Sequence, residues 1–143
     1  MAITQAMATS FKVQLLNGQQ NFSANTFKLA LYTSSATLGE NTTSYTTTNE
    51  VAATGNYTAG GNTLTVSVTP TNSGNVAYIS FSNTSWANAT ITANGALIYN
   101  NSKSNAAVCV LAFGGDKTST NGTFAVNFPT ADATNAIIRL TAS

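Results

Sequence analysis

The feature that most constrains the fold is a pair of apolar runs joined by a short polar turn. The first run covers residues 96–99 and the second covers residues 108–113, with the turn at residues 100–105. Continuous apolar runs of this length are typical of strands that are covered on both faces. The stretch 87–116 is therefore predicted to form a central β-hairpin. A β-bulge is expected at Asn94-Gly95, because apolar residues continue on both sides.

Other parts of the chain show the alternation of apolar and polar residues that predicts half-buried strands. The segments are residues 26–33, 63–69, 76–82 and 124–128, and a last apolar run covers residues 136–141. Pro70 is expected to end the second of these strands, and a polar loop is expected between Asp116 and Phe124. Counting gives about eight strands with turn signals between them. This pattern predicts an all-β protein, an antiparallel β-sandwich or jelly roll.

The N-terminal part is expected to contain a short helix at residues 10–17. Thr9 or Ser10 can supply the N-cap hydroxyl, and Gly18 can end the helix. The same segment also alternates apolar and polar residues, so a first strand is the competing interpretation. Residues 1–9 are expected to form an N-terminal arm.

Residues 34–62 do not show the alternation of apolar and polar residues, because they are mostly Thr, Ser, Gly, Asn and Ala. We expect a long surface excursion there, with one short strand near residues 49–54. Long loops of compact domains are commonly functional, and contact with a partner is the expected role. The full length of 143 residues fits a single domain, 1–143.

The composition is nearly free of charge: 6% of residues are charged, against about 25% in ordinary soluble proteins. The net charge is +1 and the five basic residues are scattered, so we expect neither a nucleic-acid partner nor a membrane partner. No signal peptide and no apolar run approaching a membrane span is evident, which indicates synthesis in a cytoplasm. A hydrophobic content of 43% in patterned runs argues against disorder.

Little in the sequence points to catalysis. The chain has no histidine, which removes the commonest catalytic base and metal ligand. Its four carboxylates stand in loop-like stretches, and a calcium site joining Asp116 and Asp132 is the remote alternative. Cys109 lies inside an apolar run and is expected to be a buried structural thiol. We therefore expect no enzyme, no metal and no cofactor.

Apolar and aromatic residues of the N-terminal segment and of the polar stretches are the candidates for a protein interface. They are Phe11, Leu15, Leu16, Tyr45, Tyr57 and Trp86. For the last three, ordinary packing under loops is the competing interpretation.

Several segments in order carry a resemblance to a known family. They are FKVQLLNGQQNF, FKLALYTSSATLG with the following TNEV, YTAGGNTL, ITANGALIYN and VLAFGGDKTSTNGTFAVNFP, and they extend from about Phe11 to Leu140. The chain resembles small structural proteins of tailed bacteriophages and is most similar to capsid decoration, or head cement, proteins. The resemblance implies a trimeric, non-enzymatic virion protein made in the bacterial host cytoplasm. It would bind the outer capsid surface and bridge major capsid subunits.

Two alternative functions remain open at the level of the sequence. One is a receptor- or carbohydrate-binding module of a phage tail or fibre, for which Trp86 with Asn83 and Asn88 are the candidate residues. The other is a tail-tube or neck component.

Overall fold

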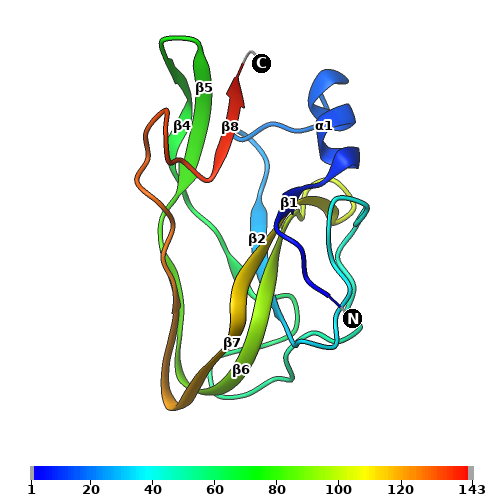
Figure 1. The fold of residues 1–143 in the computed structure, drawn as a ribbon, viewed down its shortest axis with the longest axis vertical. Helices are drawn as coiled ribbons and strands as arrows, with labels where there is room; N and C mark the ends of the chain where they lie inside the picture. Colours follow the sequence, from blue (N-terminus) through cyan, green and yellow to red (C-terminus); the bar gives the residue numbers. More distant parts are fainter. Residues whose placement is uncertain (1, 142–143) are drawn as a thin grey trace.

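The computed structural model describes residues 2–141, and in this part of the chain it contains eight strands and one short helix. Met1 and residues 142–143, which the predicted domain and arm include, lie outside the described residues. The strands form two antiparallel sheets, one in the order β1-β7-β6-β2-β3 and one in the order β4-β5-β8. The sheets form a sandwich (Figure 1), and this confirms the predicted all-β sandwich.

The elements have the following bounds. The five-stranded sheet consists of β1 (Ala6–Met7), β7 (Ala106–Val126), β6 (Thr84–Asn100), β2 (Phe27–Tyr32) and β3 (Asn62–Thr63). The three-stranded sheet consists of β4 (Val66–Ser73), β5 (Val76–Phe81) and β8 (Ile138–Thr141), and the helix α1 covers Thr9–Leu16.

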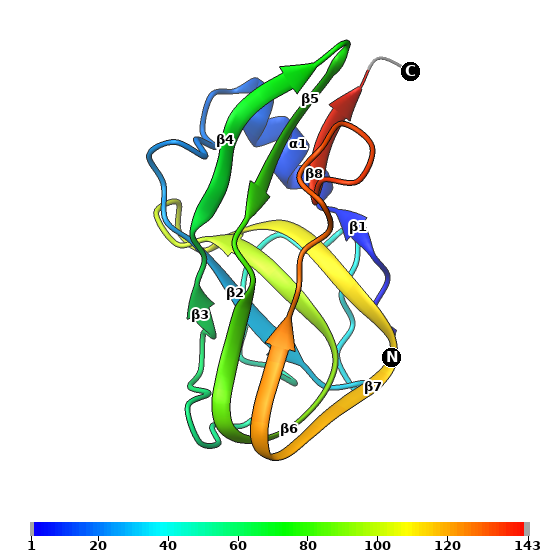
Figure 2. The same cartoon turned by 90° about the vertical axis from the view of Figure 1, so that its left-hand side faces the viewer.

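The predicted central hairpin is present and is longer than expected, because β6 and β7 pair from Thr84↔Val126 to Asn100↔Ala106. The register shift between Ala93 and Gly95 confirms the predicted bulge. The polar loop predicted between Asp116 and Phe124 is wrong, since these residues continue β7. Their polar side chains mostly face solvent while their backbone pairs with β6. Further register shifts accompany the bend of the hairpin in Figure 2.

The strand predicted at residues 63–69 is divided between the two sheets. Asn62–Thr63 pairs with β2, and Val66–Ser73 pairs with β5. The prediction that Pro70 ends the strand is wrong. Strand β4 lies at a sheet edge, where a residue without an N–H group is tolerated, and the ladder shifts register between Val68 and Thr71.

The helix is confirmed, and its start differs from the prediction. Ala8 is the N-cap residue and no side chain caps the helix, so the assignment of Thr9 or Ser10 is wrong. The N–H groups of Ala8 and Thr9 donate instead to the carbonyl oxygens of Val108 and Glu40, at 2.9 and 2.8 Å. These bonds fix the start of the helix directly after β1. The predicted stop is confirmed, because Gly18 follows the helix at φ +71°.

The N-terminal segment and the excursion pack on the body of the protein. The N–H of Thr4 donates to the carbonyl oxygen of Leu38 at 2.9 Å, and β1 pairs with β7. The strand predicted near residues 49–54 is reduced to isolated bridges at Glu50 and Thr54. The excursion rejoins the sheet at Gly61, whose φ is +73° and where an added Cβ would lie 1.7 Å from the oxygen of Leu29. Only glycine allows this close approach.

An aromatic cluster connects the helix, the five-stranded sheet and the three-stranded sheet. Phe22 stacks on Phe27 of β2 at 4.5 Å between ring centroids, and it meets Phe11 of α1 edge to face at 5.9 Å. Phe81 of β5 lies 6.0 Å from Phe27. All four rings are buried. The cluster therefore holds α1 at a fixed distance from β5, and a cleft opens above it.

Candidate interaction surface

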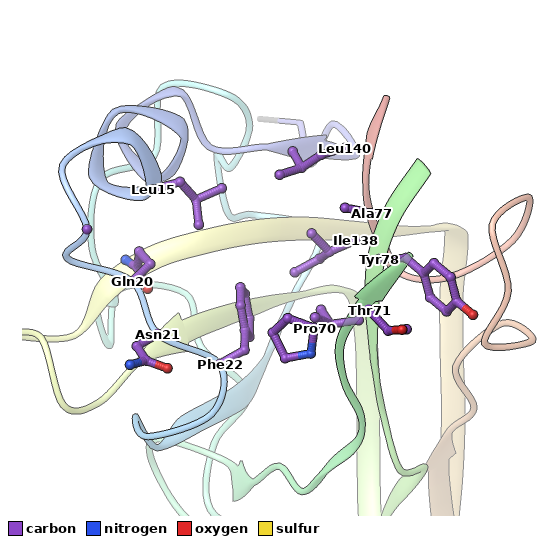
Figure 3. Close-up of a pocket in the computed structure, with 12 residues that line it drawn as sticks. Leu15, Gln20, Asn21, Phe22, Pro70, Thr71, Ala77, Tyr78, Ile138 and Leu140 are labelled. Carbon is purple, nitrogen blue, oxygen red and sulfur yellow. The ribbon is translucent and has the colours of Figure 1, made fainter. Parts of the chain in front are cut away.

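The main hollow of interest lies between α1 and the three-stranded sheet and has a volume of about 400 Å³. We call it the α1 cleft, and Figure 3 shows its lining. Its apolar lining residues are Leu15, Phe22, Pro70, Ala77, Ile79, Ile138 and Leu140, and its polar lining side chains are those of Gln20, Asn21, Thr71 and Tyr78. None of the described residues that line it is charged. The cleft is thus an uncharged and mostly apolar surface that faces solvent.

The geometry of the elements explains why these side chains meet. Leu15 follows the buried Phe11 by one helical turn, so the two share a face of α1. Ile138 and Leu140 are two residues apart on β8 and therefore share one face of the sheet. Strand β5 pairs Ala77 with Leu140 and extends that face. Leu15 and Ile138 point toward the same space from opposite walls (Figure 3).

Exposed apolar side chains flank the cleft. Among residues 2–141, the large apolar side chains that are exposed are Leu16 at 89%, Val13 at 52% and Leu140 at 48%. They belong to α1 and β8, which both contribute residues to the lining of the cleft. A surface that combines an apolar hollow with projecting leucines is typical of a protein-binding site.

A second group of polar side chains fastens the excursion to the sheet. The Glu50 carboxylate accepts hydrogen bonds from the hydroxyls of Tyr45 and Tyr57 at 2.6 and 2.8 Å, and from the N–H of Gly60 at 2.7 Å. The Tyr57 hydroxyl also accepts a bond from the N–H of Leu31 in β2 at 2.8 Å. Glu50 therefore acts as an anchor of the excursion.

The tyrosines of this region have raised pKa values. Burial, together with the charge of Glu50, raises the pKa of Tyr99 to about 12. Burial is also the main reason that the pKa values of Tyr32, Tyr45 and Tyr57 are raised further. These hydroxyls are thus held protonated in the folded state.

Alkaline pH is expected to destabilise the protein through these tyrosines. A pKa that is higher in the folded state than in the unfolded state gives stability that is complete below pH about 10 and is lost as the pH rises through 12. Chemical unfolding followed by circular dichroism over this range should show a falling midpoint. Tyrosinate absorbance should appear together with unfolding. Complete titration of Tyr32, Tyr45, Tyr57 and Tyr99 near pH 10 in a folded protein would contradict this expectation.

The structure separates the six residues predicted for the interface. Leu15 is half-buried in the α1 cleft and Leu16 is exposed beside it. The other four lie elsewhere: Phe11, Tyr57 and Trp86 are buried in the core, and Tyr45 is half-buried against Tyr99 at 4.7 Å. For Tyr45, Tyr57 and Trp86 the structure agrees with the competing interpretation, which is packing, and Phe11 is also a core residue.

The residues that sequence reasoning missed are those of the sheet wall, Pro70, Ala77, Ile138 and Leu140. The spacing of Ile138 and Leu140 gives a weak signal for one apolar strand face. Nothing in the sequence indicates that this face lies opposite α1.

Trp86 has no solvent-exposed face for a sugar. The indole is 1% exposed and lies between Tyr57 and Phe124, at centroid distances of 5.3 and 6.4 Å. The side-chain oxygen of Asn83 accepts a bond from the N–H of Phe128 at 2.7 Å. The aromatic residue predicted for a carbohydrate site is therefore part of the core.

The surroundings of the described carboxylates and of the thiol bear on whether these groups could bind a metal or react. Within residues 2–141, no three His, Cys, Asp or Glu side chains come together as metal ligands would. Asp116 accepts a bond from the Asn94 amide at 2.9 Å, and the side chain of Asn135 lowers the pKa of Asp132. Burial raises the pKa of the Cys109 thiol to about 12, which opposes thiolate chemistry.

Two further findings complete the description of the surface. In the described part of the chain, no helix has the length and apolar character needed to span a membrane. Comparison with protein families, curated proteins and solved structures gave no match to this chain.

Proposed function

We propose that this protein is a structural component of a tailed-bacteriophage virion that binds the outer capsid surface and stabilises the shell. In this proposal it is a capsid decoration protein that bridges major capsid subunits and is not an enzyme. The observation that carries the proposal is the outer surface of the excursion at residues 34–62, whose exposed residues are mostly small and uncharged. Such a surface suits close contact with another protein, and the sequence resemblance supports the capsid as the partner. The α1 cleft, an uncharged and mostly apolar hollow with exposed leucines nearby, supports association with further copies of the chain.

The low charge of the chain favours close association with other proteins. With charged residues at 6% of the chain, few ions lose their water when two surfaces meet. Binding to the assembled shell alone would shift the assembly equilibrium toward the shell. Many copies on one shell would add their effects through avidity.

The remaining parts of the proposal concern assembly and place. The protein forms a trimer, sits at a three-fold or pseudo-three-fold axis of the shell, and is made in the bacterial host cytoplasm before it joins the virion. The excursion at residues 34–62 faces the shell. Its outer residues are mostly small and uncharged, which suits close contact with a second surface.

Binding of the purified protein to shells of the major capsid protein tests this function. We expect co-sedimentation at a fixed ratio and a higher temperature of shell disassembly when the protein is present. Ala53→Arg places a large cation on the exposed part of the excursion and should weaken shell binding at least about tenfold. Ser67→Arg, at an exposed position of β4, is the matched control and should bind normally. Absence of co-sedimentation with wild-type protein would contradict the proposal.

A further inference from the structure

We propose that the α1 cleft is the contact through which two copies of this chain associate, with Leu16 of one copy entering the cleft of its neighbour. This inference rests on the homo-oligomer in the proposed function and specifies the surface that builds it. The shell then meets a different part of the molecule, the excursion.

The contents of the cleft define the chemistry of its occupant. The described lining is uncharged and mostly apolar, with Gln20, Asn21, Thr71 and Tyr78 as its polar members, and Leu140 of β8 is in contact with solvent. A volume of about 400 Å³ corresponds to roughly a dozen water molecules, which is ample for one or two leucine side chains. Apolar side chains without charged neighbours are therefore the fitting occupants.

The chain itself carries such an occupant beside the hollow. Leu16 is the most exposed large apolar side chain among residues 2–141, and it projects from the helix that forms one wall. A rotation axis near this end brings the leucine of one copy to the cleft of the next and repeats the contact in every copy. A second copy thus buries the hollow and the projecting side chains together.

The charges around the cleft permit this contact. Lys12 is the charged residue of α1, and it is exposed one turn before Leu16, where its long side chain can stay at the rim. Arg139 lies between Ile138 and Leu140 in sequence, so its side chain is on the opposite face of β8. There it lines a separate hollow beside β1 and not the α1 cleft. Association through the cleft therefore places no described charge at its centre.

The oligomeric mass in solution gives the first test. We expect sedimentation equilibrium of the wild-type protein to show a homo-oligomer. The double variant Leu16→Asp, Leu140→Asp should be mainly monomeric, with an association constant at least about tenfold lower. Both positions are exposed, so the monomer should keep its circular dichroism spectrum. Thr120→Asp, on the exposed bend of the hairpin, is the control and should associate as the wild type does.

Disulfide formation between two single variants tests the geometry. A mixture of Leu16→Cys and Ala77→Cys proteins should form an intermolecular disulfide under mild oxidation, since Ala77 is exposed in the cleft. The native Cys109 is buried and should not react. A mixture of Leu16→Cys and Thr120→Cys is the control and should form little of the mixed product.

The outcomes separate this inference from the proposed function. A wild-type monomer at high concentration overturns the inference, even if that monomer binds shells. Loss of shell binding by a Leu16→Asp protein that is still an oligomer would assign the cleft to the shell and would also overturn the inference. If the wild-type protein is an oligomer, the Leu16→Cys and Ala77→Cys variants form the mixed disulfide, and the oligomer does not bind shells, the inference would stand and the proposed function would be contradicted.

Discussion

Replacing Trp86 with alanine is expected to lower the free energy of unfolding by about 3–5 kcal/mol. The indole is 1% exposed and fills the space between Tyr57 and Phe124, so its removal leaves a cavity. For a chain of this length the midpoint of thermal unfolding should fall by about 10–20 °C. Circular dichroism is the suitable measurement, because Trp86 is the sole tryptophan in the sequence and its fluorescence is lost in the variant.

Trp86→Phe is the matched variant for this prediction. It keeps an aromatic ring in the site, and the indole Nε1 has no hydrogen-bond partner among the described residues, so the substitution breaks no hydrogen bond there. Trp86→Phe should lower the free energy of unfolding by about 1–2 kcal/mol. If Trp86→Ala left stability unchanged and instead abolished shell binding, the residue would belong to an interface, as one interpretation of the sequence proposed.

Replacing Glu50 with alanine is expected to cost about 2–4 kcal/mol of stability and to loosen the excursion. The change removes the acceptor for the hydroxyls of Tyr45 and Tyr57 and for the N–H of Gly60. A buried donor that loses its partner costs about 1–3 kcal/mol. Tyr57 keeps its bond from Leu31, which limits the loss. Urea unfolding measures the first effect, and amide hydrogen exchange of residues 50–60 measures the second.

Glu40→Ala supplies the control for the Glu50 prediction. Glu40 is an exposed carboxylate of the same excursion, and its carbonyl bond to the helix is kept by any side chain. The free energy of unfolding of the Glu40→Ala variant should stay within about 0.5 kcal/mol of the wild-type value. Equal effects of the two substitutions would show that Glu50 contributes only through general surface charge.

The elements that the sequence predicted well are those whose side-chain pattern and burial agree. Strand β2 alternates large apolar residues, and the hairpin arms around Asn100 are apolar and buried, so local pattern and final packing coincide. A helix was also predicted, at residues 10–17, although the start of the observed helix depends on bonds from the N–H groups of Ala8 and Thr9 to the carbonyl oxygens of Val108 and Glu40. Such bonds connect distant parts of the chain and leave no local signal.

The missed strand segments are those in which backbone pairing outweighs the side-chain signal. Residues 117–123 are polar and were predicted as a loop, yet β6 supplies hydrogen-bond partners along this part of β7. Pro70 was predicted to end its strand. Because β4 is an edge strand, the missing N–H group of proline need not cost a hydrogen bond between strands. Neither the partner strand nor the edge position is visible in a single sequence.

The α1 cleft could be predicted only in part for a similar reason. Leu15 and Leu16 were named as interface residues; Leu15 lines the helix side of the cleft, and Leu16 is exposed beside it. The other side comes from β4, β5 and β8, which lie far from the helix in sequence. Trp86 and Tyr57 were misleading signals, since an aromatic residue in a polar stretch can equally be the anchor that holds that stretch to the core.

Cryo-electron microscopy of the phage particle that carries this chain tests the central proposal most directly. We expect density for the sandwich on the outside of the head at symmetry axes between capsomers. The excursion should face the shell, and the α1 clefts should lie between copies of the protein. Density confined to the tail or its fibres would contradict the account and would favour a receptor-binding role instead.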